Sequence, residues 1–177
     1  MGPWKHNRVH AAGSAKPIKI GLTHDASGQF ANSGQAEKRG TIMAIQEANE
    51  KGGVLGRQVE YVWMDTETNP QTGTRVAERM ITRENVHFLA GAIQSGTANA
   101  ISQVAQKYGC VYFNTNSSSP TESGKNCHRV KFVWDGNGEN FARAAARNAI
   151  NAFGKNWMLI YNDYVWGQNT NKATKTV

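Results

Sequence analysis

The spacing of the apolar positions changes along the chain from residue 17 to the end: it is two residues in some stretches and three to four in others. A period of two is typical of a strand, and a period of three to four is typical of a helix with one buried face. The expected strands are 18–22, 57–65, 86–90, 111–113, 130–134 and 156–161. The expected helices are about 33–51, one opened by Asn69-Pro70, 97–108, 141–153, and one that begins after 163–167.

Strand and helix therefore alternate, and the strands are strongly apolar. This pattern predicts an α/β fold with a doubly wound parallel sheet that is covered by helices on both faces. Ligands of such sheets bind outside the carboxyl ends of the strands. The loops expected at that edge are 23–33, 65–69, 91–97 and 114–121.

Two of these loops, 91–97 and 114–120, consist of small and polar residues. The first leads into a helix N-terminus, where free backbone amides and the helix dipole favour an anion. The hydroxyl of Ser95 beside those amides suits a carboxylate or a phosphate. The alternative is that Ser95 only caps the helix that starts near Thr97.

The strand and helix pattern restarts after residue 120. A lone strand–helix–strand unit from about residue 130 cannot cover both faces of its own sheet. We therefore expect an incomplete first lobe at 17–129 and the truncated start of a second lobe at 130–177, so that the sequence is a fragment.

The net charge of +7, from 20 basic and 13 acidic residues, carries little information about partners. Residues 1–19 hold four of the basic residues and no acidic one, and elsewhere the two signs are interspersed. Arg75, Arg79 and Arg83 share one helical face without aromatic residues that could stack on bases, so we expect no nucleic-acid partner. No apolar run is long enough to span a bilayer, so we expect no direct membrane insertion.

Residues 1–16 are expected to be a disordered tail or the remnant of a signal peptide. Residues 11–15 have the small side chains of a cleavage region, but no apolar segment precedes them. The two cysteines, Cys110 and Cys127, lack zinc spacing, and they form either one disulfide or two free thiols.

No catalytic, metal or cofactor motif is present. There is no phosphate-binding glycine loop and no Gly-x-Ser-x-Gly sequence, and 135–139 lacks the spacing of a calcium loop. His24 and Asp25 are adjacent on one loop and cannot readily serve as base and orienting group for Ser27. We therefore expect no enzyme, no cofactor and no metal.

The order of motifs resembles the periplasmic substrate-binding proteins of ABC importers, specifically the branched-chain amino acid binding type. The most specific segment is Asn49-Glu50-Lys51-Gly52-Gly53, followed by Leu55-Gly56. The other stretches that carry the resemblance are 18–28, 65–70, 91–95, 116–120 and 162–167. The resemblance implies a two-lobed clamp of the type I periplasmic binding fold that closes on a small ligand and delivers it to a membrane permease.

The resemblance also implies the ligand contacts. They are Ile93, Gln94 and Ser95 in one loop, Asn116, Ser117 and Ser118 in the next, and Trp166 from the second lobe. Export to the periplasm would favour a Cys110–Cys127 disulfide. For Gln94, Ser117 and Trp166 the alternatives are a solvent-facing side chain, an ordinary turn and a core position, respectively. The alternative function is a cytoplasmic ligand sensor of the same fold that regulates a partner protein.

Overall fold

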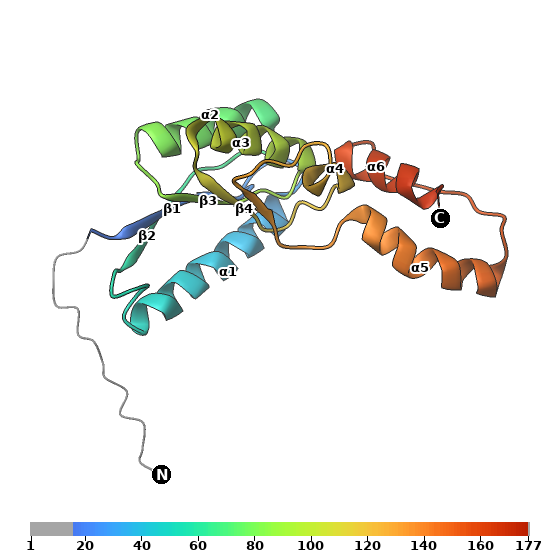
Figure 1. Cartoon of the computed structure of the whole chain (residues 1–177), viewed down its shortest axis with the longest axis horizontal. Helices are drawn as coiled ribbons and strands as arrows, with labels where there is room; N and C mark the ends of the chain where they lie inside the picture. The colour runs from blue at the N-terminus through green and yellow to red at the C-terminus, as the bar shows by residue number, and fades with distance from the viewer. Residues whose placement is uncertain (1–15, 177) are drawn as a thin grey trace, which may run out of the picture.

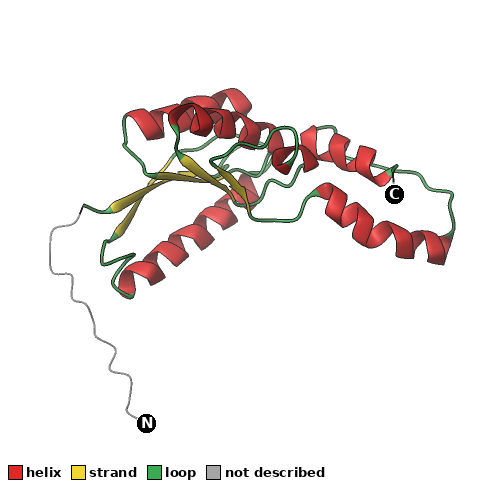
Figure 2. Cartoon of the chain, viewed as in Figure 1, coloured by secondary structure: helices red, strands yellow, loops and turns green. Residues whose placement is uncertain are grey.

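The computed structural model describes residues 16–176, and the tail expected at 1–16 lies almost entirely outside them. Strands and helices alternate through most of this range (Figures 1 and 2). The strands are β1 (Ile18–Thr23), β2 (Val59–Trp63), β3 (Phe88–Gly91), β4 (Val111–Asn114) and β5 (Lys131–Val133). The helices are α1 (Ala31–Glu50), α2 (Pro70–Thr82), α3 (Ser95–Tyr108), α4 (Pro120–Ser123), α5 (Gly138–Phe153) and α6 (Val165–Thr174).

The five strands form one sheet in the order β2-β1-β3-β4-β5, and every pairing is parallel. Helices α2 and α3 cover one face of this sheet, and α1 lies on the other (Figures 1 and 2). The predicted α/β class with a doubly wound parallel sheet is confirmed. Because all strands run the same way, their carboxyl ends and the loops that follow them meet at one edge.

Strand β5 extends the sheet beyond the lobe boundary expected from the sequence. Its residues pair with β4 through Tyr112↔Lys131, Phe113↔Phe132 and Asn114↔Val133. The single sheet therefore includes residues up to Val133. A division of the chain near residue 130 stays a prediction.

The strand expected at 156–161 is wrong. Residues 154–163 contain no helix or strand, and every side chain from 151 to 163 is exposed. Trp157, Met158 and Ile160 give this segment a strand-like apolar pattern. A strand also needs a neighbouring strand that accepts and donates backbone hydrogen bonds, and none lies beside this segment within residues 16–176.

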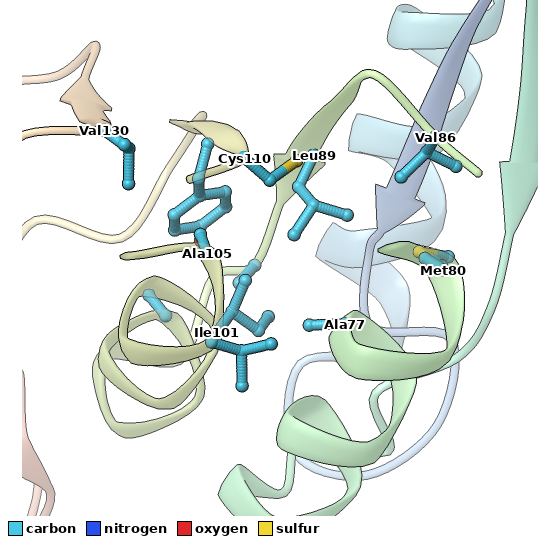
Figure 3. Close-up of a cluster of buried hydrophobic side chains, with 12 residues drawn as sticks. Ala77, Met80, Val86, Leu89, Ile101, Ala105, Cys110 and Val130 are labelled. Atoms are coloured by element: carbon cyan, nitrogen blue, oxygen red, sulfur yellow. The ribbon is translucent and has the colours of Figure 1, made fainter. Parts of the chain in front are cut away.

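The apolar core lies between the sheet and the α2–α3 layer (Figure 3). Ala77 and Met80 of α2 pack with Ile101 of α3 and with Leu89 and Tyr112 of the strands, and all five are fully buried. Helix α2 is capped by Asn69, the residue before it, whose side chain accepts from the amides of Gln71 and Thr72. This cap fits the start predicted from Asn69-Pro70. Among the described residues, no helix has both the length and the apolar character needed to cross a membrane.

Candidate functional site

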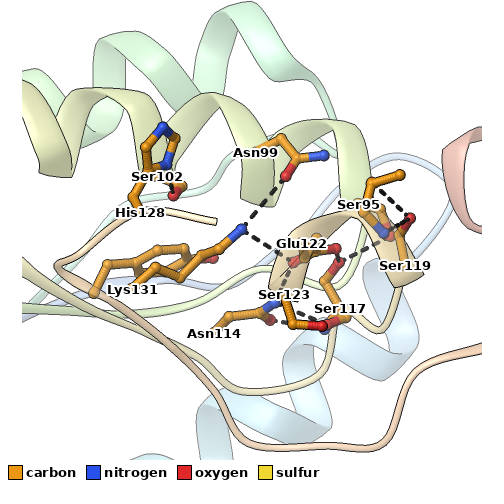
Figure 4. Close-up of polar contacts among 12 residues, drawn as sticks. Ser95, Asn99, Ser102, Asn114, Ser117, Ser119, Glu122, Ser123, His128 and Lys131 are labelled. Carbon is orange, nitrogen blue, oxygen red and sulfur yellow. Dashed lines mark hydrogen bonds and ion pairs between the residues drawn. The ribbon is translucent and has the colours of Figure 1, made fainter. Parts of the chain in front are cut away.

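The loops after β3 and β4 lie side by side, because these two strands are neighbours in the sheet and Gly91 pairs with Asn114. The Oγ atoms of Ser95 and Ser117, one from each loop region, are 2.9 Å apart (Figure 4). Both residues are almost completely buried. The structure therefore brings together the two serines predicted from separate loops.

Helix α3 begins at Ser95, two residues earlier than expected, and Gln94 is its N-cap. The Gln94 Oε1 atom accepts a hydrogen bond from the Thr97 amide at 2.6 Å and another from the Thr97 hydroxyl at 3.2 Å. The alternative in which Ser95 caps the helix is therefore wrong. Its hydroxyl instead faces Ser117, and the side chain of Gln94 is engaged with the helix.

Asn114 folds the loop after β4 into a tight turn. Its Oδ1 atom accepts from the amide of Ser117 at 2.9 Å, and its Nδ2 atom donates to the carbonyl of Ser117 at 2.8 Å. Asn116 is exposed at the tip, Ser118 is partly exposed, and Ser117 points inward. The three predicted residues of this loop thus differ in exposure, and only Ser117 is positioned to contact Ser95.

A buried ion pair lies directly behind the serines. The carboxylate of Glu122 on α4 and the ammonium of Lys131 on β5 are 3.8 Å apart, and at most 1% of either side chain is exposed. Ser117 Oγ and Asn114 Nδ2 donate to Glu122, and Lys131 Nζ donates to Asn99 Oδ1 at 3.5 Å (Figure 4). Burial raises the pKa of Glu122, although the Ser117 hydrogen bond and Lys131 oppose this, and burial lowers the pKa of Lys131.

Sequence reasoning missed both members of this pair. A signal was present, because Lys131 interrupts the apolar run Val130–Val133, and a charged residue within an otherwise apolar strand needs a partner wherever its side chain is buried. The partner itself, nine residues earlier in a four-residue helix, has no sequence signature.

A second polar cluster ties the end of β1 to the loop after β3. Asp25 is fully buried, and its carboxylate accepts from the Thr66 hydroxyl and from the amide of Ile93 at 3.2 Å. His24 is also fully buried, and burial, with a contribution from Lys38, lowers the pKa of His24 to about 4. The backbone of Ile93 is thereby held by Asp25, while its side chain is only partly buried.

Glu37 on α1 belongs to the same region and accepts a hydrogen bond from the Thr115 hydroxyl. Burial raises the pKa of Glu37 from 4.5 to about 7, and the nearby charge of Asp25 adds to the rise. Glu37 lines an open groove of about 730 Å³ between α1 and the loop after β4, together with Ser33, Thr41, Asn116 and Trp134. The exposed Asn116 is thus part of the wall of this groove.

Replacing Glu37 with glutamine should remove part of the pH dependence of folding. A carboxyl group whose pKa is raised on folding stabilises the protein fully below pH 4.5, and this contribution is lost as the pH rises through about 7. The loss amounts to at most about 3 kcal/mol for a shift of this size. Urea unfolding of wild type and Glu37→Gln between pH 4.5 and 8 should give free energies that converge or cross. The prediction is contradicted if the free energies of unfolding of the two proteins differ by the same amount at every pH. The titration of His24 acts in the opposite direction, but it is present in both proteins and cancels when their free energies are subtracted.

Trp166 lies in the first turn of α6, in an aromatic cluster that extends to Phe30 just before α1. Its ring is 6.2 Å from that of Tyr164, and Tyr164 meets Phe30 edge to face at 5.6 Å. Asn169 on α6 also donates to Ser119 Oγ at 3.1 Å. The start of α6 is therefore placed against the loops at the sheet edge, and Phe30 is a contact that the sequence did not reveal.

The two cysteines do not form the disulfide that export would favour. Both are free thiols: Cys110 is buried directly before β4, and Cys127 is exposed. Burial raises the pKa of Cys110, which makes it a poor nucleophile. Within residues 16–176, no group of three or more His, Cys, Asp or Glu side chains is arranged to hold a metal ion.

Comparison with known proteins adds the family context. A family model described as periplasmic binding protein matches residues 17–177. Leu/Ile/Val-binding protein homolog 7 of Brucella abortus (strain 2308) is 39% identical over 103 residues, which are 58% of this chain and 26% of that protein. The chain thus matches about a quarter of the length of this relative.

Two solved structures have the same fold. A periplasmic binding protein from Burkholderia mallei is 26% identical, with a TM-score of 0.80 over 90% of this chain and 42% of that one. A solute-binding protein of an ABC transporter from R. palustris, solved in complex with 4-hydroxybenzoate, is 24% identical. Its TM-score is 0.80, over 92% of this chain and 43% of that one.

Proposed function

Because the chain belongs to the periplasmic binding protein family, we propose that it captures a small carboxylate-bearing solute outside the cytoplasm for an ABC importer, without catalysis. The membrane partner would be the permease of that importer. The ligand candidates are branched-chain amino acids, other amino acids or amides, and aromatic acids. The relative from Brucella abortus is named for leucine, isoleucine and valine, and the R. palustris protein holds 4-hydroxybenzoate.

The observation that carries this proposal is the meeting of Ser95 and Ser117 at the N-terminus of α3. The first amides of a helix have no acceptor within the helix, and the helix dipole favours negative charge there. A carboxylate that reaches this point can accept from those amides and from the Ser95 hydroxyl. Ile93 and Gln94 would frame it on one side, and Asn116 and Ser118 on the other.

Ligand entry requires movement, since Ser95 is fully covered. In the proposed clamp, residues 17–129 form most of the first lobe and residues from about 130 begin the second. The aromatic contact between Phe30 and Tyr164 and the Asn169–Ser119 hydrogen bond would break as the lobes separate. Trp166 would then face the ligand from the second lobe.

Replacing Ser95 with alanine tests the proposed binding site for the ligand carboxylate. Loss of a hydrogen bond to a charged group should weaken binding by about 1.5–3 kcal/mol, or roughly ten- to a hundredfold. In the full-length protein, calorimetry with leucine, isoleucine, valine, benzoate and 4-hydroxybenzoate should identify a ligand and then show this loss. Ser123→Ala, at an exposed serine of α4, is the matched control and should bind as wild type does. Unchanged affinity in Ser95→Ala would remove Ser95 from the site.

The second candidate is a cytoplasmic sensor of the same fold. The two free thiols favour it, because unpaired cysteines are typical of reducing compartments. Fractionation of cells that produce the protein distinguishes the two. Recovery in the periplasmic fraction supports the solute-capture role, and recovery with the cytoplasm supports the sensor.

A further inference from the structure

The two site serines and Glu122 form a continuous chain of hydrogen bonds. Ser117 Oγ lies within hydrogen-bond distance of Ser95 Oγ on one side and of Glu122 Oε1 on the other (Figure 4). Each hydroxyl carries one proton and can donate one hydrogen bond. The direction of the whole chain is therefore set at its end, by whether Glu122 accepts or donates.

An ionised Glu122 can only accept, so Ser117 donates to it, and the Ser95 hydroxyl donates to Ser117 or to Glu122 itself, since a hydrogen bond from Ser95 also lowers the pKa of Glu122. Ser95 then turns only lone pairs toward the helix N-terminus, which a ligand carboxylate cannot use. A neutral Glu122 that carries its proton on Oε1 donates to Ser117, and Ser117 donates to Ser95. The proton of Ser95 is then free to point at a carboxylate.

The surroundings of Glu122 place that proton on the side of the serines. Its Oε2 atom faces two donors, Asn114 Nδ2 and Lys131 Nζ, and this leaves Oε1 for the proton. The other titratable groups nearby are Tyr112 on β4, and Cys127 and His128 in the segment before β5. Tyr112 donates to the Gly91 carbonyl and His128 contacts Ser102 at 2.5 Å, so neither is hydrogen-bonded to Glu122. Burial raises the pKa of Glu122, and the Ser117 hydrogen bond and the charge of Lys131 oppose that rise.

We propose that Glu122 is a positioning residue and that a carboxylate ligand seated at Ser95 is captured together with one proton, which comes from solvent and binds Glu122. The incoming carboxylate then replaces the negative charge that Glu122 gives up. The buried Lys131 then provides a positive charge near the bound ligand carboxylate. The ligand carboxylate and an ionised Glu122 are never present together on the two sides of Ser95 and Ser117. This inference rests on the proposed function, because it requires a carboxylate at Ser95.

Calorimetry of the full-length wild-type protein in two buffers with different enthalpies of ionisation measures the protons exchanged on binding. The probes are the same five compounds, leucine, isoleucine, valine, benzoate and 4-hydroxybenzoate. We expect uptake of up to one proton per ligand, and affinity that falls by up to about tenfold per pH unit as the pH rises through the titration of Glu122. Binding with no uptake, or with release of a proton, overturns the inference but leaves the proposed function intact. If none of the five compounds binds, the proposed function fails and this inference fails with it.

Glu122→Gln separates proton coupling from a structural role. Asn114 and Lys131 would hold the amide oxygen of glutamine on their side, so its NH₂ group would donate to Ser117 permanently. We expect affinity within about threefold of the best wild-type value, no proton uptake, and no pH dependence from this position. A purely structural role for Glu122 predicts lower stability with unchanged uptake per ligand bound, which would overturn the inference. Glu78→Gln, at an exposed glutamate, is the control and should leave the uptake unchanged.

Discussion

Replacing Lys131 with methionine should lower the free energy of unfolding by about 3–5 kcal/mol, because it leaves the carboxylate of Glu122 buried without its counter-ion. The loss should grow as the pH rises, since burial raises the pKa of Glu122 and the unpaired group is tolerated better when neutral. Urea unfolding at pH 5 and pH 8 measures both effects. Lys107→Met, which breaks the exposed pair with Glu78, is the matched control and should leave the free energy of unfolding nearly unchanged.

The double variant Glu122→Leu, Lys131→Met should recover most of that stability. A buried ion pair is often no more stabilising than apolar side chains of similar volume, whereas half of a pair is strongly destabilising. A double variant as unstable as Lys131→Met would show that the loss comes from packing around β5. Ligand binding should be impaired in the double variant even where stability is recovered, because Ser117 loses the carboxyl group of Glu122 that orients its hydroxyl.

The second large effect is expected in the core. Ile101→Ala should destabilise the protein by about 2–5 kcal/mol, because Ile101 is fully buried in the layer between α2, α3 and the sheet and its truncation leaves a cavity. The same substitution at Ile160, which is 91% exposed, should change stability by less than about 0.5 kcal/mol. Thermal or urea unfolding measures both variants. Similar losses at the two positions would contradict the burial described for them.

The fold was predictable from the sequence because its signals are local. The alternating periods indicated the strands and helices, Asn69-Pro70 marked the start of α2, and the apolar strands indicated a parallel sheet. The failure at 156–161 has a physical reason. An alternating apolar pattern is compatible with a strand, but the backbone hydrogen bonds of a strand are made with a neighbouring strand.

The site was predictable only in part, and for the same reason. The serine loops are visible in the sequence, since polar residues after an apolar strand mark the carboxyl edge of a sheet. The chain of hydrogen bonds from Ser95 to Glu122, and the contact between Phe30 and Tyr164, join residues that are far apart in sequence or lie on different elements. No periodicity encodes such pairs, so a single sequence indicates the loops and not the groups behind them.

The strand order β2-β1-β3-β4-β5 also bears on how the sheet assembles during synthesis. After β2 has paired with β1, each later strand joins the opposite edge in the order in which it leaves the ribosome: β3 on β1, β4 on β3, and β5 on β4. No strand has to be inserted between two that are already paired. Nascent chains can therefore build this sheet from the N-terminus outward, and each new strand covers the edge that would otherwise invite pairing with another chain.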